Sequence, residues 1–304
     1  MKLKNLLLVV LGVAASYASF AQSNLLNAKT PDEIGKKTAA QLESDNDKPL
    51  PYGYVHDRDV LMGKTVWELI DLDERINFPM YYPVDTAFVG KERRSLFSVL
   101  LKGIKDGKIT EVYGDDYFNS KKTLADIESV FKFRDTTQAG IDEYNNYFDD
   151  YKSGKKVLSA EFINETEVSA ADVAGYKIKG FWYFDKRQSE LKYRLLAICP
   201  TATEARGKAK GEVDPIELFW VYFPSIRDVL HDAKAFNDKN SAMPITFDHL
   251  LNSRRFNGVI YKEENVYGDR TIDDYMKDNA QLQLLESERV KEKIRNFEQD
   301  MWNY

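Results

Sequence analysis

The sequence predicts an α+β protein in which an antiparallel β-meander is flanked by helices and followed by a long C-terminal helix. Residues 176–184 alternate between apolar and polar side chains, and the apolar run 191–198 follows after a polar turn, a pattern typical of an antiparallel hairpin. Residues 94–104 form an apolar run of helical length. Residues 271–302 contain neither glycine nor proline, which favours one continuous helix.

The block 66–83 is expected to form a short amphipathic helix followed by an extended segment. Its apolar side chains, Trp67 among them, recur at near-helical spacing, and charged side chains occupy the other face. Because proline interrupts a helix and restricts the residue before it, Pro79 should end this helix. The chain should then run on extended through Tyr81 and Tyr82.

The remainder of residues 52–140 reads as a helix-rich half of the protein. The apolar helix at 94–104 should end at Gly107 and lead into a strand at 108–113. A further short helix is expected at 124–133.

The β-meander half is expected at residues 141–270. It begins with a polar, tyrosine-rich connection at 142–156. After the hairpin, a solvent-exposed loop at 201–215 should lead to a third strand at 216–223. An antiparallel sheet of this kind usually packs one face on the core and exposes the other.

Two stretches of the chain show a weak sequence similarity to each other. Residues 97–115 and 247–269 both run from an apolar helix through a glycine to a Tyr-Gly-Asp triplet, with spacing that drifts by a few residues. This internal similarity fits either a duplicated helix–strand unit or chance.

The C-terminal segment should form one helix roughly 45 Å long. Thr271 is well suited to cap it. Its apolar stripe consists of Val290, Ile294, Phe297 and Met301. A stripe of this length packs either on its own domain or on a neighbouring subunit.

The N-terminus has the features of a secretory signal peptide. Lys2 and Lys4 precede an apolar stretch at 6–13, and small residues precede an expected cleavage between Ala21 and Gln22. The expected organisation is a signal peptide at 1–21, a flexible arm at 22–51, the helix-rich half at 52–140, the β-meander half at 141–270 and the C-terminal helix at 271–304.

The acidic balance of the chain argues against two classes of partner. The formal net charge is −6, and removal of the basic N-terminus makes it more negative. Nucleic acid and anionic lipid both favour basic surfaces, so neither is expected to bind unaided. Cys199 is the only cysteine, which excludes an intramolecular disulfide. It is either a buried small apolar residue or the site of an intermolecular disulfide.

No catalytic or metal-binding motif stands out in the sequence. The three histidines, His56, His231 and His249, lie apart and form no metal-binding pattern, so no metal and no cofactor is expected. Adjacent acidic pairs occur, but neighbouring carboxylates rarely converge on one ion. Thr86 and Thr136 fit a short pattern for periplasmic O-glycosylation that chance explains better.

The density of aromatic residues is the positive signal for function. One small sheet cannot bury all of these rings in a modest core, so part of them is expected to meet another chain, with core packing alone as the alternative. The candidate partner-contact residues are Trp67, Tyr81, Tyr82, Trp182, Trp220, Tyr222, Phe223 and Phe297.

Three separated blocks, at 66–83, 176–200 and 214–230, resemble the GldN (PorN) family of the type IX secretion and gliding-motility machinery. The resemblance covers about residues 54–267. It implies a non-enzymatic periplasmic subunit that forms a ring with an outer-membrane lipoprotein, GldK (PorK), and with neighbouring copies of itself. Contact with the periplasmic part of the GldL/GldM (PorL/PorM) motor is a further implied partnership.

The resemblance also implies a location at the inner face of the outer membrane, where the lipoprotein would hold the subunit. Two other functions are open on the residues alone. One is a periplasmic hydrolase, which needs carboxylates that converge in a cleft, and such convergence is not visible in a sequence. The other is a monomeric binding or chaperone module.

Overall fold

The computed structural model describes residues 30, 48–87, 89–90, 93–153, 155–237, 245–277 and 279–302. The expected signal peptide, the Ala21–Gln22 cleavage site and nearly all of the expected arm at 22–51 lie outside the described residues. Residues 49–236 and 245–304 form one compact unit; a second unit, 1–48 with 237–244, contains only three described residues.

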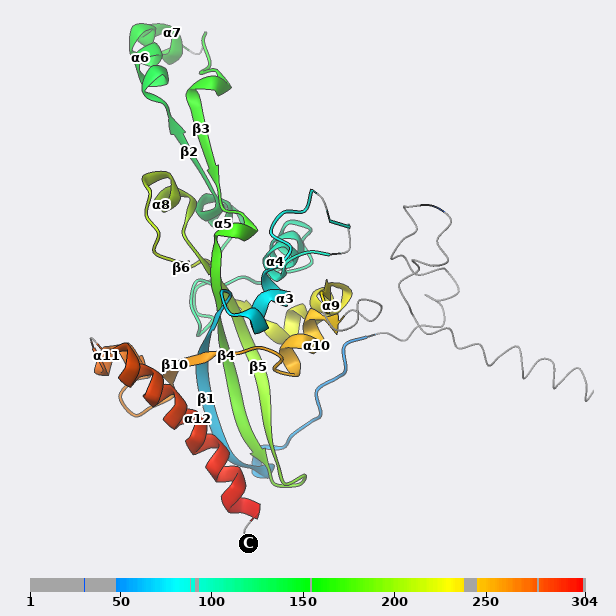
Figure 1. Ribbon diagram of the computed structural model, residues 1–304. Helices are drawn as coiled ribbons and strands as arrows, with labels where there is room; N and C mark the ends of the chain where they lie inside the picture. Colours follow the sequence, from blue (N-terminus) through cyan, green and yellow to red (C-terminus); the bar gives the residue numbers. More distant parts are fainter. Residues whose placement is uncertain are drawn as a thin grey trace, which may run out of the picture. The chain divides into compact units, whose positions relative to one another are not determined.

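The described secondary structure is mixed, as expected for an α+β protein (Figure 1). The strands are β1 (Val60–Asp71), β2 (Lys132–Thr136), β3 (Ile163–Glu167), β4 (Val173–Asp185), β5 (Glu190–Ala202), β6 (Ile216–Glu217), β7 (Val221–Tyr222), β8 (Lys234–Ala235), β9 (Ile245–Thr246) and β10 (Val259–Glu263). The helices are α3 (Phe78–Tyr81), α4 (Leu96–Lys105), α5 (Leu124–Phe131), α6 (Gln138–Asn146), α7 (Phe148–Lys152), α8 (Ala205–Lys210), α9 (Phe223–Asp232), α10 (Phe247–Asn252), α11 (Ile272–Tyr275) and α12 (Ala280–Trp302).

The centre of the fold is an antiparallel sheet whose described strands run in the order β10-β1-β4-β5-β6, with β7 also paired to β5. The long strands β1, β4 and β5 form its middle (Figure 1). The predicted hairpin is confirmed: β4 and β5 pair from Asp185↔Glu190 to Val173↔Ala202. Alternation of apolar and polar residues was sufficient to identify it because the hairpin is a local structure.

The prediction of a helix at the start of the 66–83 block is wrong. Residues 66–71 belong to β1, in which Val66, Trp67 and Ile70 are all buried. Trp67 packs on the opposite face of the sheet from Val66, so both faces of the strand are covered and the apolar residues are contiguous. That run resembles a helical pattern. Pro79 does not end a helix either; it lies in the first turn of α3, where its missing N–H costs nothing.

Other elements agree with the sequence in part. Helix α4 is confirmed, with Ser95 as its cap and Gly107 at φ 70° after its end, and α5 is confirmed with an earlier end than expected. The strand expected at 108–113 is absent among the described elements, and Tyr113 alone makes isolated bridges there. The expected loop at 201–215 contains α8, and the segment 216–223 is divided between β6, β7 and the start of α9.

The connection expected at 142–156 is largely helical, since it holds most of α6 and all of α7. The similarity between residues 97–115 and 247–269 extends in the structure only to their helices. Both α4 and α10 begin at a hydroxyl cap, Ser95 and Thr246. Strand β10 follows α10, whereas α4 is followed by irregular chain.

The C-terminal segment forms two helices rather than one. Thr271 caps the short α11 in a capping box with Asp274, and α12 begins at Ala280. Val290 and Ile294 of α12 are buried against Val66 and Ile260 of the sheet. Helix α12 therefore packs on its own sheet, over β10 and β1 (Figure 1).

The core consists of three clusters around the sheet. The largest includes Ile70 and Tyr176 of the sheet and is covered by helices that include α4, α9 and α10. A second cluster, which contains Trp67, Cys199 and Trp220, lies on the opposite face. The third lies under α12, on the same face as the first, because Val66 and Ile70 are four residues apart in one strand.

Candidate functional site

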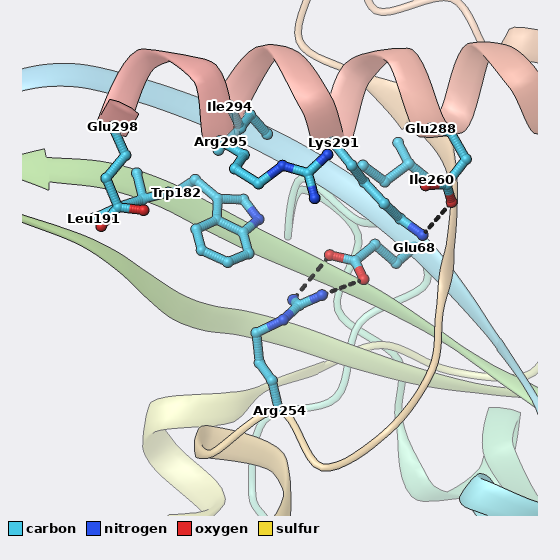
Figure 2. Close-up of a pocket in the computed structure, with 10 residues that line it drawn as sticks. All are labelled: Glu68, Trp182, Leu191, Arg254, Ile260, Glu288, Lys291, Ile294, Arg295 and Glu298. Carbon is cyan, nitrogen blue, oxygen red and sulfur yellow. Dashed lines mark hydrogen bonds and ion pairs between the residues drawn. The ribbon is translucent and has the colours of Figure 1, made fainter. Parts of the chain in front are cut away.

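A cleft of about 400 Å³ lies between α12 and the sheet (Figure 2). Side chains of α12 form one wall, and Arg254, from the loop after α10, approaches from the other side. The lining residues are Glu68, Trp182, Leu191, Arg254, Ile260, Glu288, Lys291, Ile294, Arg295 and Glu298. The cleft thus lies where the first and third core clusters meet on one face of the sheet.

A buried ion pair forms the floor of this cleft. Glu68 lies between Val66 and Ile70 in β1, and 1% of its surface is exposed. Arg254 donates from Nη1 and Nη2 to the two carboxylate oxygens of Glu68 at 2.9 and 2.8 Å. Its guanidinium also lies over the rings of Tyr193 and Trp182, at 4.2 and 5.0 Å from their centres.

The pair is a structural clamp rather than a ligand-binding group. Burial alone would lower the pKa of Arg254, but the hydrogen bonds and charge of Glu68 outweigh it and the pKa is raised. Both ends of the guanidinium fork are engaged by the carboxylate. The pair therefore fastens the 253–257 loop to the middle of the sheet.

The α12 wall of the cleft neutralises most of its own charge. Lys291 pairs with Glu288 at 3.0 Å, and Arg295 lies 3.7 Å from Glu292. The apolar surfaces of Trp182, Leu191 and Ile260 occupy the remaining lining. Such a lining suits an apolar side chain of another protein better than a small charged substrate.

Gly180 is needed beside the cleft because the Tyr193 ring covers it. A Cβ at this position would overlap the Tyr193 ring and hydroxyl. We expect Gly180→Ala to lower the free energy of unfolding by about 1–3 kcal/mol, since Tyr193 stacks on Arg254 and cannot move without disturbing the clamp. Urea denaturation measures the loss. Gly53→Ala is the control, because no atom lies within 4 Å of its added Cβ; equal stability of the two variants would contradict the expectation.

The structure separates the candidate contact residues into three groups. Trp67, Trp220 and Phe223 are buried in the core and have no surface to offer a partner in this conformation. Tyr82 and Tyr222 are 49% and 39% exposed. The half-buried members are Tyr81, Trp182 and Phe297, and the last two line clefts on the flanks of α12.

Sequence reasoning missed the Glu68–Arg254 pair. The helix expected in the 66–83 block places Glu68 on its charged face, and no sequence pattern points to Arg254. Glu68 can be recognised as an acidic residue in a strand whose neighbouring residues face the core on both sides of the sheet. This recognition requires that residues 60–71 are known to form a strand.

Among the described residues, no group of three or more histidine, cysteine, aspartate or glutamate side chains is placed to hold a metal ion. His56 accepts a hydrogen bond from the Arg58 N–H at 3.3 Å and so caps a short turn. In the described part of the chain, no helix is both long and apolar enough to cross a membrane.

Cys199 is fully buried, and burial raises the pKa of its thiol, so the thiolate is not populated at neutral pH. Its Sγ lies 3.4 Å from the Pro200 carbonyl oxygen. We expect Cys199→Ser to cost about 1–3 kcal/mol of stability because a hydroxyl replaces a weakly polar group in the core. The native thiol should react with a thiol reagent only as fast as the protein unfolds; rapid reaction of the folded protein would contradict this.

Comparison with known proteins identifies the family of the chain. The sequence profile of the family described as "Gliding motility associated protein GldN" matches residues 55–303, which span the sheet and all the helices around it. No curated protein matched the chain. The extent of the family match, over most of the sequence, confirms the resemblance found in the three blocks. The chain belongs to the GldN family of gliding-motility and type IX secretion components.

Proposed function

We propose that this chain is a non-enzymatic, periplasmic structural subunit that forms a ring complex with the outer-membrane lipoprotein GldK (PorK) of the type IX secretion and gliding-motility machinery. The observation that carries the proposal is the family match over residues 55–303. The character of the α12 cleft supports it, because the buried charges there are paired within the chain and the lining is mostly apolar.

Two kinds of surface are available for contact with partners. The clefts beside α12 expose parts of Trp182 and Phe297, and the exposed rings of Tyr82 and Tyr222 lie elsewhere on the unit. Aromatic side chains of this kind commonly provide the anchors of protein interfaces. A ring follows when one surface of a copy meets a different surface of the next and the rotation between them closes.

The location follows from the same proposal. The signal-like N-terminus delivers the chain to the periplasm, and the lipoprotein holds it at the inner face of the outer membrane. Its periplasm-facing surface is then available to the GldL/GldM (PorL/PorM) motor.

Co-purification tests the proposal. The full chain and the lipoprotein, produced together and extracted from the envelope with detergent, should elute as one particle whose native mass corresponds to many copies of both. Envelope fractionation should find the chain with the outer membrane only when the lipoprotein is present. A chain that stays monomeric beside the lipoprotein, or one that fractionates independently of it, contradicts the proposal.

A further inference from the structure

A two-stranded ribbon carries two helices away from the main sheet. Strands β2 and β3 pair from Lys132↔Glu167 to Thr136↔Ile163, and α6 and α7 lie at the end of this ribbon (Figure 1). We call residues 132–167 the ribbon lobe. The sequence predicts residues 142–156 of this lobe as a connection between the two halves.

The ribbon lobe lacks a core of its own. Of its described residues, Gly140 is the only buried one, and it is held between Thr136 and Phe162. A two-stranded hairpin is marginally stable in water, and chain segments below about 40 residues rarely fold alone without cross-links or metals. The described residues of the lobe therefore supply little apolar cover for one another, although α8 packs against β2 and β3.

The lobe exposes an apolar stripe that a partner protein could cover. Ile141 and Tyr144 lie one turn apart on α6, and Phe148 begins α7 after the break at Tyr147; they are 43%, 41% and 46% exposed. The rings of Tyr144 and Phe148 meet edge to face at 5.6 Å. Apolar and aromatic side chains grouped in this way commonly provide the anchors that enter an apolar groove of another protein.

The charge of the lobe indicates the kind of groove. Residues 132–167 contain eight acidic and five basic side chains, so this short segment accounts for half of the net charge of −6. Asp142 and Asp149 are exposed next to the stripe and form no ion pair with a described residue. Lys156 is already engaged, by Glu143 at 3.6 Å and by the ring of Tyr147. An acidic lobe disfavours a second acidic copy or an anionic lipid surface and favours a basic rim.

We propose that the ribbon lobe docks its Ile141–Tyr144–Phe148 stripe into an apolar groove with a basic rim on a different protein of the machinery. This inference rests on the proposed function, in which the lipoprotein is the neighbouring protein that provides the groove. Binding completes the missing core of the lobe.

The first experiment compares two double variants of the full chain. Tyr144→Ala/Phe148→Ala should weaken binding to the purified, unlipidated lipoprotein at least about tenfold, with an unchanged melting temperature of the free chain. The control is Val266→Ala/Tyr267→Ala, which removes two exposed apolar side chains outside the lobe and should leave affinity within about twofold of wild type. Wild-type affinity of the lobe variant overturns the proposal.

A shortened chain tests the lobe without relying on single side chains. Because Thr136 and Ile163 are paired across the ribbon, residues 137–162 can be replaced by Asn-Gly, which closes the ribbon with a tight turn. The shortened chain should fold, since the described residues among those replaced contribute no buried side chain. It should lose the interaction to the same extent as the double variant; retained binding overturns the proposal.

Photo-cross-linking in cells separates this inference from the proposed function. A benzophenone side chain at position 144 of the full chain should capture a peptide of another protein that is apolar and carries neighbouring lysine or arginine residues. Capture of such a peptide from the lipoprotein supports the lobe inference. A chain that binds the lipoprotein without giving this product contradicts the inference alone, whereas a wild-type chain that does not bind the lipoprotein contradicts the proposed function. A product made of two copies of this chain, or flotation of the chain on phosphatidylglycerol vesicles that depends on the stripe, overturns the inference.

Discussion

Arg254→Met should lower the free energy of unfolding by about 3–5 kcal/mol, because it leaves the Glu68 carboxylate buried and unpaired in the middle of the sheet. Methionine keeps most of the length and apolar contact of the arginine stem, so the loss reports the missing charge. Urea denaturation followed by tryptophan fluorescence measures it through the transition midpoint.

The matching control removes both charges. Glu68→Gln/Arg254→Met should recover most of the loss, since replacing a whole buried ion pair is often close to neutral whereas removing one partner is costly. A double variant that is less stable than Arg254→Met would contradict the view of the pair as a coupled clamp. Exposed pairs such as Lys121–Glu111 should change stability by no more than about 1 kcal/mol when broken.

Trp67→Ala should cost about 3–5 kcal/mol of stability, because it empties a buried site in the second core cluster. The loss also uncovers two lysines: the ammonium groups of Lys179 and Lys262 lie 4.9 and 4.2 Å from the centre of the Trp67 ring. Thermal unfolding of the free chain measures the effect. Partner affinity, corrected for the unfolded fraction, should stay unchanged because Trp67 has no exposed surface.

Trp67→Phe is the graded control. The Trp67 indole N–H has no hydrogen-bond partner among the described residues, so phenylalanine loses ring volume but no hydrogen bond, and it should cost clearly less than alanine. An unaltered melting temperature for Trp67→Ala, together with weaker partner binding, would contradict the assignment of this residue to the core.

The parts of the fold that could be predicted from sequence are local. The β4–β5 hairpin brings together residues that are close in the chain, and the Thr271 cap is a signal contained within four residues. Strand β1 could not be predicted in the same way. Its contiguous Val66 and Trp67 face opposite sides of a sheet, and only the pairing with β4, more than a hundred residues later, determines that arrangement.

The same limit applies to the candidate site. Trp182 and Phe297 were chosen for their aromatic character, and both border clefts beside α12. The floor of the main cleft joins Glu68 to Arg254 across 186 positions of sequence, which no local pattern connects. Tyr144 and Phe148 of the ribbon lobe lie within the segment 142–156, which the sequence predicts as a polar connection because its apolar residues are few and stand among acidic neighbours.

The fastening of α12 to the edge of the sheet has a consequence for how the fold opens. The Ser287 hydroxyl of α12 accepts the N–H of Ile260 in β10 at 2.9 Å, and it is buried. Proteins open in cooperative units whose free energies lie below that of global unfolding, and a terminal helix that covers its own small cluster is such a unit. Release of α12 frees the Ile260 amide to exchange its hydrogen with solvent while the larger cluster stays closed. The exchange rate of one edge-strand amide therefore reports the attachment of a helix that follows it in the chain.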